Sequence, residues 1–200
     1  MTRPFLLGLT GSIGMGKSTT AAMFAAEGLP VWDADATVHR LYAPGGAAVQ
    51  PIAALCPGAV RDGAVDRQKL KDWIATDQGA IGRIEAVVHP LVAADRAAFI
   101  AKAAETGTDI VVLDVPLLFE TGGDRMVDAT VVVTAPADVQ RARVLARPAM
   151  TETQFATILQ RQIPDSEKRA RATYVIGTET MEGARDAVRE VIVRIRKTHA

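Results

Sequence analysis

Short apolar runs and longer segments with helical spacing alternate along this 200-residue chain. The runs at 5–10 (FLLGLT), 31–33 (VWD), 110–114 (IVVLD) and 129–135 (ATVVVTA) are mostly apolar, which is typical of strands buried on both faces of a parallel sheet. A shorter run of the same kind, TYVIG, lies at 173–177. The pattern therefore predicts about five parallel strands.

The segments between these runs have the spacing of helices. One helix is expected to begin at Lys17 and to end at Gly28, another to be stopped by Pro148, and a long one to follow His89 and to end near Gly107. Near the C-terminus a single apolar stripe at helical spacing holds Ala184, Val188, Val191, Ile192 and Ile195. Strands that alternate with helices predict an α/β fold with helices on both faces of the sheet.

Residues 37–88 differ from the rest of the chain. The turn sequences YAPGG, CPG and RDGAVD separate short, mostly helical pieces such as RQKLKDWIA and GRIEAVV. A chain of this length forms one substantial core, with room for a small additional lobe. We therefore expect a single domain over residues 1–200, with a helical insert at 37–88.

A glycine-rich loop lies between the first strand and the first helix. Residues 11–18 (GSIGMGKS) fit the pattern GxxxxGK[ST] in the setting that this motif requires. Successive backbone N–H groups of such a loop surround a phosphate chain at a helix N-terminus, where the helix dipole favours negative charge. The residues expected to bind the nucleotide are Gly11, Ser12, Ile13, Gly14, Met15, Gly16, Lys17, Ser18 and Thr19.

Two of these residues have expected roles of their own. Lys17 is expected to reach the β- and γ-phosphates, and Ser18 to place its hydroxyl on Mg²⁺. The loop thus predicts a P-loop NTPase with a three-layer α/β/α fold that binds ATP and Mg²⁺. A strand-to-helix turn without a ligand is the other interpretation of these glycines.

Further residue types narrow the reaction class. The sequence contains no asparagine, so it lacks the Asn-Lys-x-Asp motif with which a GTPase reads its base, and a motor protein needs more chain. A small kinase remains, and Asp33 is placed at a strand end to accept the proton of an attacking hydroxyl. We expect Asp35 to cap the next helix or to hold Mg²⁺-bound water, and Asp114 to approach the metal. Each of the three carboxylates is also a common turn or cap residue.

Composition excludes several other classes. Lys plus Arg and Asp plus Glu both number 23, so the charge balance gives no support to a nucleic-acid partner. The single cysteine, Cys56, forms no intrachain disulfide, which fits a reducing compartment. The apolar start is too short for a signal peptide, and no run approaches the length of a membrane span. We expect a cytoplasmic protein without a membrane partner, of undetermined oligomeric state.

Several segments together resemble one known family. GLTGSIGMGKST, WDADATVHRLY, HPLV, DVPLLFE, VQRARVLAR and QRQIPDSEKRARATYVI follow one another as in the dephospho-coenzyme A kinases, over almost the whole chain. The resemblance implies ATP-dependent phosphorylation of the ribose 3′-hydroxyl of dephospho-coenzyme A, which gives coenzyme A and ADP. It also implies that the insert at 37–88 binds the acceptor and that residues 137–172 form a lid.

The resemblance assigns roles to individual residues. Asp33 becomes the acceptor-activating aspartate, Arg143 a catalytic lid arginine and Arg147 a nucleotide contact, with the two arginines on one face of a helix. A solvated basic face is the alternative for this pair. The residues expected to contact the acceptor are Asp33, Asp35, His89, Leu117, Leu118 and Phe119. A helix cap is the alternative for His89, and ordinary core for the apolar triplet.

Two positions depart from the family pattern. Thr173 and Thr178 stand where the family usually has an acid and an amide. The second change affects an expected adenine contact and therefore the nucleotide preference. Two other functions stay open at this point: a kinase for another small metabolite or a nucleoside, and a nucleotide-binding regulatory protein without turnover.

Overall fold

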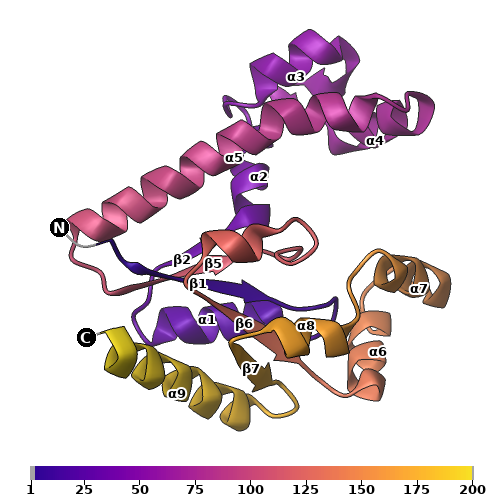
Figure 1. The fold of residues 1–200 in the computed structure, drawn as a ribbon. Helices are drawn as coiled ribbons and strands as arrows, with labels where there is room; N and C mark the ends of the chain where they lie inside the picture. The colour runs from indigo at the N-terminus through magenta and orange to yellow at the C-terminus, as the bar shows by residue number, and fades with distance from the viewer. Residues whose placement is uncertain (1–2, 200) are drawn as a thin grey trace. The chain divides into compact units, whose positions relative to one another are not determined.

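A computed structural model describes residues 3–199 of the chain. It contains two compact units, one formed by Met1–Trp32 together with Ala103–Ala200 and the other by Asp33–Lys102. Figure 1 shows the elements of both units. The domain expected over 1–200 includes residues 1, 2 and 200, which lie outside the described part of the chain. The insert expected at 37–88 falls inside the second unit.

The first unit is built on a parallel sheet of five strands in the order β2-β5-β1-β6-β7. The strands are β1 (Phe5–Thr10), β2 (Val31–Asp33), β5 (Ile110–Asp114), β6 (Ala129–Thr134) and β7 (Tyr174–Gly177). Leu7 of β1 pairs with Val112 of β5 on one side and with Ala129 of β6 on the other. The predicted α/β fold with about five parallel strands is confirmed.

Five α-helices and a short 3₁₀ helix complete the described part of this unit. They are α1 (Lys17–Ala26), η2 (Gly123–Met126), α6 (Ala137–Leu145), α7 (Glu152–Gln160), α8 (Asp165–Arg171) and α9 (Met181–His199). The apolar stripe expected on the last helix is buried in the core. The expected lid, 137–172, corresponds to α6, α7 and α8.

Both faces of the sheet are covered. Leu7 belongs to the core cluster that also contains residues of α1 and α9. The next side-chain position, Gly8, points to the opposite face, where an added Cβ would lie 2.8 Å from Leu118. On that face the hydroxyl of Thr134 also donates to Asp165 of α8 at 2.8 Å. Helices α1 and α9 therefore lie on one face, and α8 with the segment after β5 lies on the other (Figure 1).

The second unit is mainly helical. Its elements are α2 (Ala34–Tyr42), α3 (Val49–Leu55), η1 (Pro57–Ala59), β3 (Val60–Arg61), β4 (Ala64–Val65), α4 (Arg67–Thr76) and most of α5 (Ala80–Glu105). The strands β3 and β4 pair antiparallel across the Asp62-Gly63 turn, in which both residues have positive φ angles. A separate cluster around the fully buried Ile52 forms the core of this unit.

The boundary expected at the His-Pro pair is wrong. His89 and Pro90 lie inside α5, which begins at Ala80 and joins two segments that the sequence analysis treated as separate. Proline in a helix interior removes one backbone hydrogen bond and normally disfavours the helix. Ile84 and Val88 pack into the core of the unit, so burial of this part of α5 outweighs that penalty.

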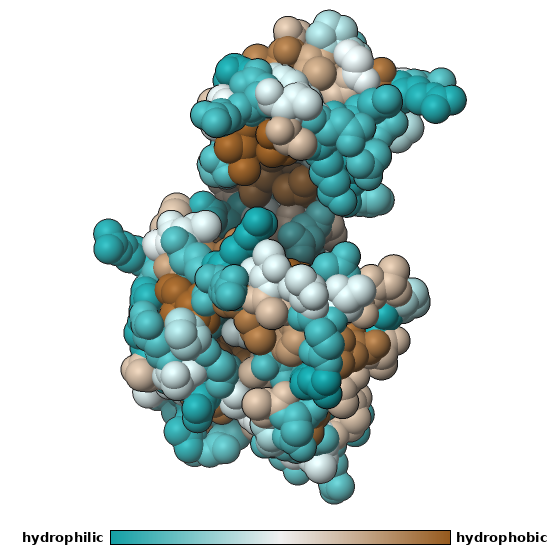
Figure 2. Space-filling model, turned by 90° about the vertical axis from the view of Figure 1, so that its right-hand side faces the viewer, coloured by the Kyte–Doolittle hydropathy of each residue, from teal (hydrophilic) through white to brown (hydrophobic). Residues whose placement is uncertain are grey.

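On the face drawn in Figure 2, hydrophilic residues cover most of each unit, and hydrophobic residues gather in a few small patches. Among residues 3–199, no helix combines the length and the apolar character that a membrane crossing requires.

Candidate active site

The glycine-rich loop connects β1 to α1. Its backbone at Gly14 has a φ of 78°, a left-handed value that residues with a Cβ rarely adopt. A Cβ at this position would also lie 2.5 Å from Val144 Cγ2. Gly16 occupies the N-cap position of α1, and the first turn of the helix follows with Lys17, Ser18 and Thr19. The loop therefore ends at a helix N-terminus, as phosphate binding requires.

Side chains from three other segments hold this loop. Gln162 accepts a hydrogen bond from Ile13 N at 3.1 Å, and Gln140 donates from Nε2 to Ile13 O at 2.8 Å. The hydroxyl of Thr178 donates to Met15 O at 2.8 Å. The Met15 side chain itself is buried, and its backbone N–H donates to Ser12 O at 3.1 Å, so Met15 supports the loop from within. Neither glutamine is predicted from the sequence to contact the loop, because its residue type does not distinguish it from a surface glutamine.

Lys17 and Asp114 meet at the end of β5. The Lys17 Nζ lies 2.5 Å from Asp114 Oδ1, with 16% of the lysine side chain and 2% of the aspartate exposed. A residue expected to bind phosphate and a residue expected to approach the metal are therefore in direct contact. Ser18 is exposed in the first turn of α1.

Asp33 ends β2 and caps α2. Its Oδ1 accepts a hydrogen bond from Ala36 N at 2.9 Å, which satisfies a free N–H group of the first helical turn. Of the two roles expected for Asp35, the capping role is wrong, because Asp35 lies within the first turn of α2. The N-cap is the residue whose backbone is extended, here Asp33. The sequence does not show which of the two aspartates, Asp33 or Asp35, has this backbone conformation.

The two expected lid arginines differ in their surroundings. Arg143 donates from Nη1 to Thr178 Oγ1 at 3.0 Å and from Nη2 to Thr178 O at 2.6 Å. Arg147 is exposed, and no hydrogen bond or ion pair joins its guanidinium to another residue of 3–199. The expectation that both lie on one helix is wrong, because α6 ends at Leu145. Pro148 disfavours helical backbone at Arg147, so the helix stops earlier than the proline itself.

The remaining expected acceptor contacts are spread over both units. Leu118 and Phe119 are 1% and 4% exposed and therefore belong to the interior, whereas Leu117 is 41% exposed. His89 is exposed in the middle of α5, so a capping role for it is wrong. Of the three apolar residues, only Leu117 presents much surface to a ligand.

The two threonines that depart from the family pattern have defined partners. The backbone N–H of Thr130 donates to the Thr173 hydroxyl, and the backbone N–H of Thr173 donates to the Thr130 hydroxyl, each at 3.1 Å. These two bonds connect the residue before β7 to strand β6. Thr178 joins the glycine loop to Arg143. The hydroxyl of Thr178 thus helps to hold the loop.

Comparison with known proteins identifies the family. The family model of dephospho-CoA kinase matches residues 5–182. The chain belongs to the dephospho-CoA kinase family. It is 65% identical over 196 residues to the dephospho-CoA kinase of Cereibacter sphaeroides, with 98% of each chain covered. It is 58% identical over 191 residues to that of a Jannaschia species, with 96% of this chain and 97% of the relative covered.

A solved structure has the same fold. The crystal structure of TT1252 from Thermus thermophilus superposes with a TM-score of 0.83 at 32% identity, over 96% of this chain and 98% of that one. The P-loop fold expected from the glycine-rich loop is therefore confirmed. Membership of the dephospho-CoA kinase family also makes this chain a kinase that uses ATP as a substrate.

Proposed function

We propose that this chain transfers the γ-phosphoryl group of ATP to the ribose 3′-hydroxyl of dephospho-coenzyme A, the last step of coenzyme A synthesis. The observation that carries the proposal is the family match over 5–182, together with a glycine loop that ends at Lys17 on a helix N-terminus. The new bond joins the 3′-oxygen to the γ-phosphorus, and the bond from that phosphorus to the β–γ bridging oxygen breaks. ADP is the leaving group.

The residues of the loop have electrostatic roles in this proposal. The backbone N–H groups of Gly14, Gly16, Lys17 and Ser18 and the ammonium of Lys17 neutralise the charge that develops on the phosphate oxygens, whereas the N–H groups of Ile13 and Met15 already bind within the protein. Arg147, exposed and without a partner in 3–199, is available to do the same at the terminal phosphate. Arg143 is proposed to have two roles: it holds the loop through Thr178, and it is one of the catalytic residues.

Asp33 is assigned to the acceptor. Its carboxylate orients the 3′-hydroxyl and takes its proton as the bond to phosphorus forms. Asp35, His89 and Leu117 are assigned to acceptor binding with it, and Leu118 and Phe119 support that surface from the interior.

Ser18 and Asp114 would hold Mg²⁺ when it is bound with ATP. Both offer oxygen ligands, which Mg²⁺ prefers. Within residues 3–199 no group of three His, Cys, Asp or Glu residues is placed to hold a metal, which fits a cation that takes its other ligands from phosphate oxygens and water. The ion would neutralise negative charge on the β- and γ-phosphates.

The test is release of ADP by the purified protein with ATP, Mg²⁺ and dephospho-coenzyme A, with the product located by mass spectrometry. We expect rapid turnover that stops when Mg²⁺ is chelated. Shikimate, gluconate and nucleosides serve as control acceptors. Faster turnover of one of these, or ATP binding without turnover, would contradict the proposal.

A further inference from the structure

A buried ion pair lies beside the glycine loop. Lys168 of α8 is fully buried, and its Nζ lies 2.7 Å from Oε1 of Glu120, which is 13% exposed. Removal of both charges from water is costly, and apolar residues of similar volume often stabilise a fold equally well. Stability alone therefore does not explain why this pair is present.

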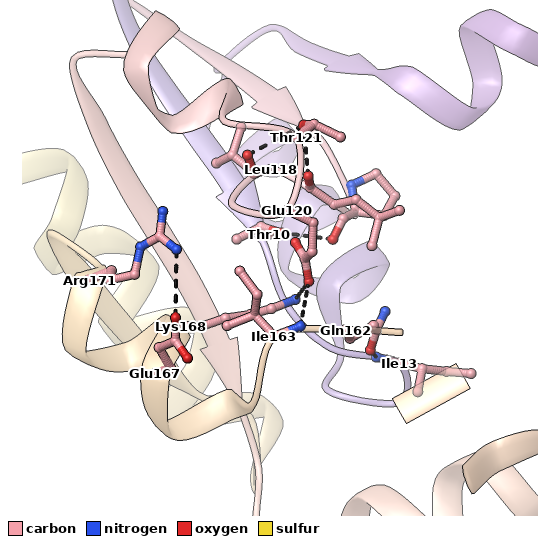
Figure 3. A network of polar contacts seen from close by, with 12 residues as sticks. Thr10, Ile13, Leu118, Glu120, Thr121, Gln162, Ile163, Glu167, Lys168 and Arg171 are labelled. Atoms are coloured by element: carbon pink, nitrogen blue, oxygen red, sulfur yellow. Dashed lines mark hydrogen bonds and ion pairs between the residues drawn. The ribbon is translucent and has the colours of Figure 1, made fainter. Parts of the chain in front are cut away.

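The same carboxylate oxygen also holds the backbone beside Gln162. Glu120 Oε1 accepts a hydrogen bond from Ile163 N at 3.0 Å. The preceding residue, Gln162, accepts from Ile13 N of the glycine loop at 3.1 Å. In Figure 3, dashed lines run from the Glu120 carboxylate to both Lys168 and Ile163, and Gln162 points toward Ile13. A continuous series of contacts thus joins the buried pair to the loop.

The peptide groups of Ile13 are held at both ends of that residue. Gln162 binds its N–H, and Gln140 of α6 donates to its carbonyl oxygen at 2.8 Å. The segment that carries Glu120 is fixed in turn, because Thr10 Oγ1 donates to Pro116 O at 3.0 Å. The orientation of Ile13 sets the direction of the N–H groups that follow it in the loop.

We propose that Gln162 is a positioning residue for the glycine loop and that the Glu120–Lys168 pair holds Gln162 in place. Gln162, Glu120 and Lys168 form what we call the loop anchor. This proposal depends on one part of the proposed function, the binding of ATP by the loop. It implies that nucleotide affinity depends on Glu120, although Glu120 acts on the loop only through Gln162.

The test is a double-mutant cycle with the ATP dissociation constant as readout, measured by calorimetry without acceptor. Gln162→Met keeps the size of the side chain and removes the acceptor atom. We expect a Kd about five-fold higher, the effect of one neutral hydrogen bond. Glu120→Gln should raise the Kd by a similar factor in the unsubstituted chain. In the Gln162→Met background it should add less than about two-fold, because the two residues act in series.

A matched control separates this role from general stabilisation. Glu27→Gln removes the Arg189–Glu27 ion pair of the same unit, in which two atoms lie 2.7 Å apart, and should leave the Kd unchanged. Glu120→Gln leaves the buried ammonium of Lys168 without its carboxylate, so thermal unfolding of each variant is measured to verify that the chain is folded when its Kd is determined. Effects that multiply in the double variant, or an unchanged Kd in Gln162→Met, would overturn the loop anchor. If the unsubstituted chain does not bind ATP, both the loop anchor and the proposed function are overturned. If it binds ATP but does not phosphorylate dephospho-coenzyme A, only the proposed function is overturned.

Discussion

At the scale of single residues, Asp33 combines a structural contact with a proposed chemical role. Its carboxylate caps α2 through Ala36 N, and the proposal also makes it the acceptor of the hydroxyl proton. Asparagine caps helices about as well as aspartate, yet it is no base at neutral pH. The two roles can therefore be separated by substitution.

We expect Asp33→Asn to keep the thermal stability of the wild type and to lower kcat about 10²–10⁴-fold, the usual range for loss of a general base. Asp33→Ala should show the same loss of kcat and should also lower the free energy of unfolding by about 1 kcal/mol, because the cap is lost. Steady-state kinetics and thermal unfolding of both variants are the measurements.

Asp66 provides the control for this comparison. It caps α4 through Gln68 N and Lys69 N, and no chemistry is assigned to it. Asp66→Asn should leave both kcat and stability unchanged. Full activity of Asp33→Asn would show that this carboxylate is not the base.

The sequence predicted the residues of the loop because their order is a motif with a physical purpose. It did not predict which aspartate caps α2, since that depends on the backbone angle at Asp33. It also missed Gln162, which reaches Ile13 from a distant part of the chain. Contacts between distant segments depend on the tertiary structure, and local pattern carries no record of them.

At the scale of elements, the glycines in the connections between strands and helices differ in how closely other residues approach them. Gly14 and Gly28 both have positive φ angles, 78° and 88°. A Cβ at Gly28 would meet nothing within 4 Å, whereas one at Gly14 would meet Val144 at 2.5 Å. These two positions form a matched pair for substitution by alanine.

We expect Gly28→Ala to lower stability by about 1 kcal/mol, the cost of left-handed backbone for a residue with a Cβ, and to leave the ATP Kd unchanged. Gly14→Ala should weaken ATP binding strongly, because the loop must move away from α6. Chemical denaturation and calorimetry measure the two effects. Equal ATP affinities in the two variants would contradict the assignment of the loop.

An ion pair links the start of β5 to α9. Arg196 Nε lies 2.6 Å from Asp109 Oδ2, and the hydrogen bond from Arg196 lowers the pKa of Asp109 below its ordinary value. A lowered folded pKa means that the pair adds stability above the unfolded pKa, about 3.9, and that this stability is lost as the pH falls through the folded pKa.

Because both side chains are about half exposed, we expect a contribution of at most about 1 kcal/mol. Asp109→Asn should therefore be slightly less stable than the wild type at pH 7, and the difference should vanish near pH 2. Denaturant titrations at the two pH values measure it, with Arg196→Gln as the complementary variant. A difference that persists at the lower pH would rule out ionisation of Asp109 as its cause.

Helix boundaries were predicted less well than strands. The runs at β1, β5 and β6 are buried on both faces and give an unambiguous signal. The sequence predicts a helix start at Pro90, but Pro90 lies inside α5 because core packing on both sides of it maintains the helix. Proline penalties are local, whereas the burial that outweighs them depends on the whole unit.

At the scale of the whole molecule, each substrate should protect a different unit. We expect ATP to slow amide hydrogen exchange at residues 11–19 of the first unit, and dephospho-coenzyme A to slow it within 37–88 of the second. Hydrogen exchange followed by mass spectrometry measures both effects. Lys17→Met is the control, because it should remove the protection by ATP. Protection by dephospho-coenzyme A confined to the first unit would contradict an acceptor-binding insert.

The strand order could not be predicted from the sequence. Runs of apolar residues show that strands exist, and the βαβ pattern shows that they are parallel, but neither reveals that β1 lies between β5 and β6. The family resemblance supplied the division into core, insert and lid. Helix α5 extends beyond the expected insert at 88 and continues to Glu105, which the sequence did not predict.

The position of β1 at the centre of the sheet has a consequence for synthesis on the ribosome. Both of its neighbours, β5 and β6, are translated long after it, so the nascent first strand has no partner strand until β5 is made and has both partners only when the chain reaches Thr134. The residues of the second unit, by contrast, are contiguous and emerge in between. We therefore expect the helical unit to fold first and the nucleotide-binding core to form around β1 afterwards. The reason is that the contacts of β1 are with strands far away in the sequence.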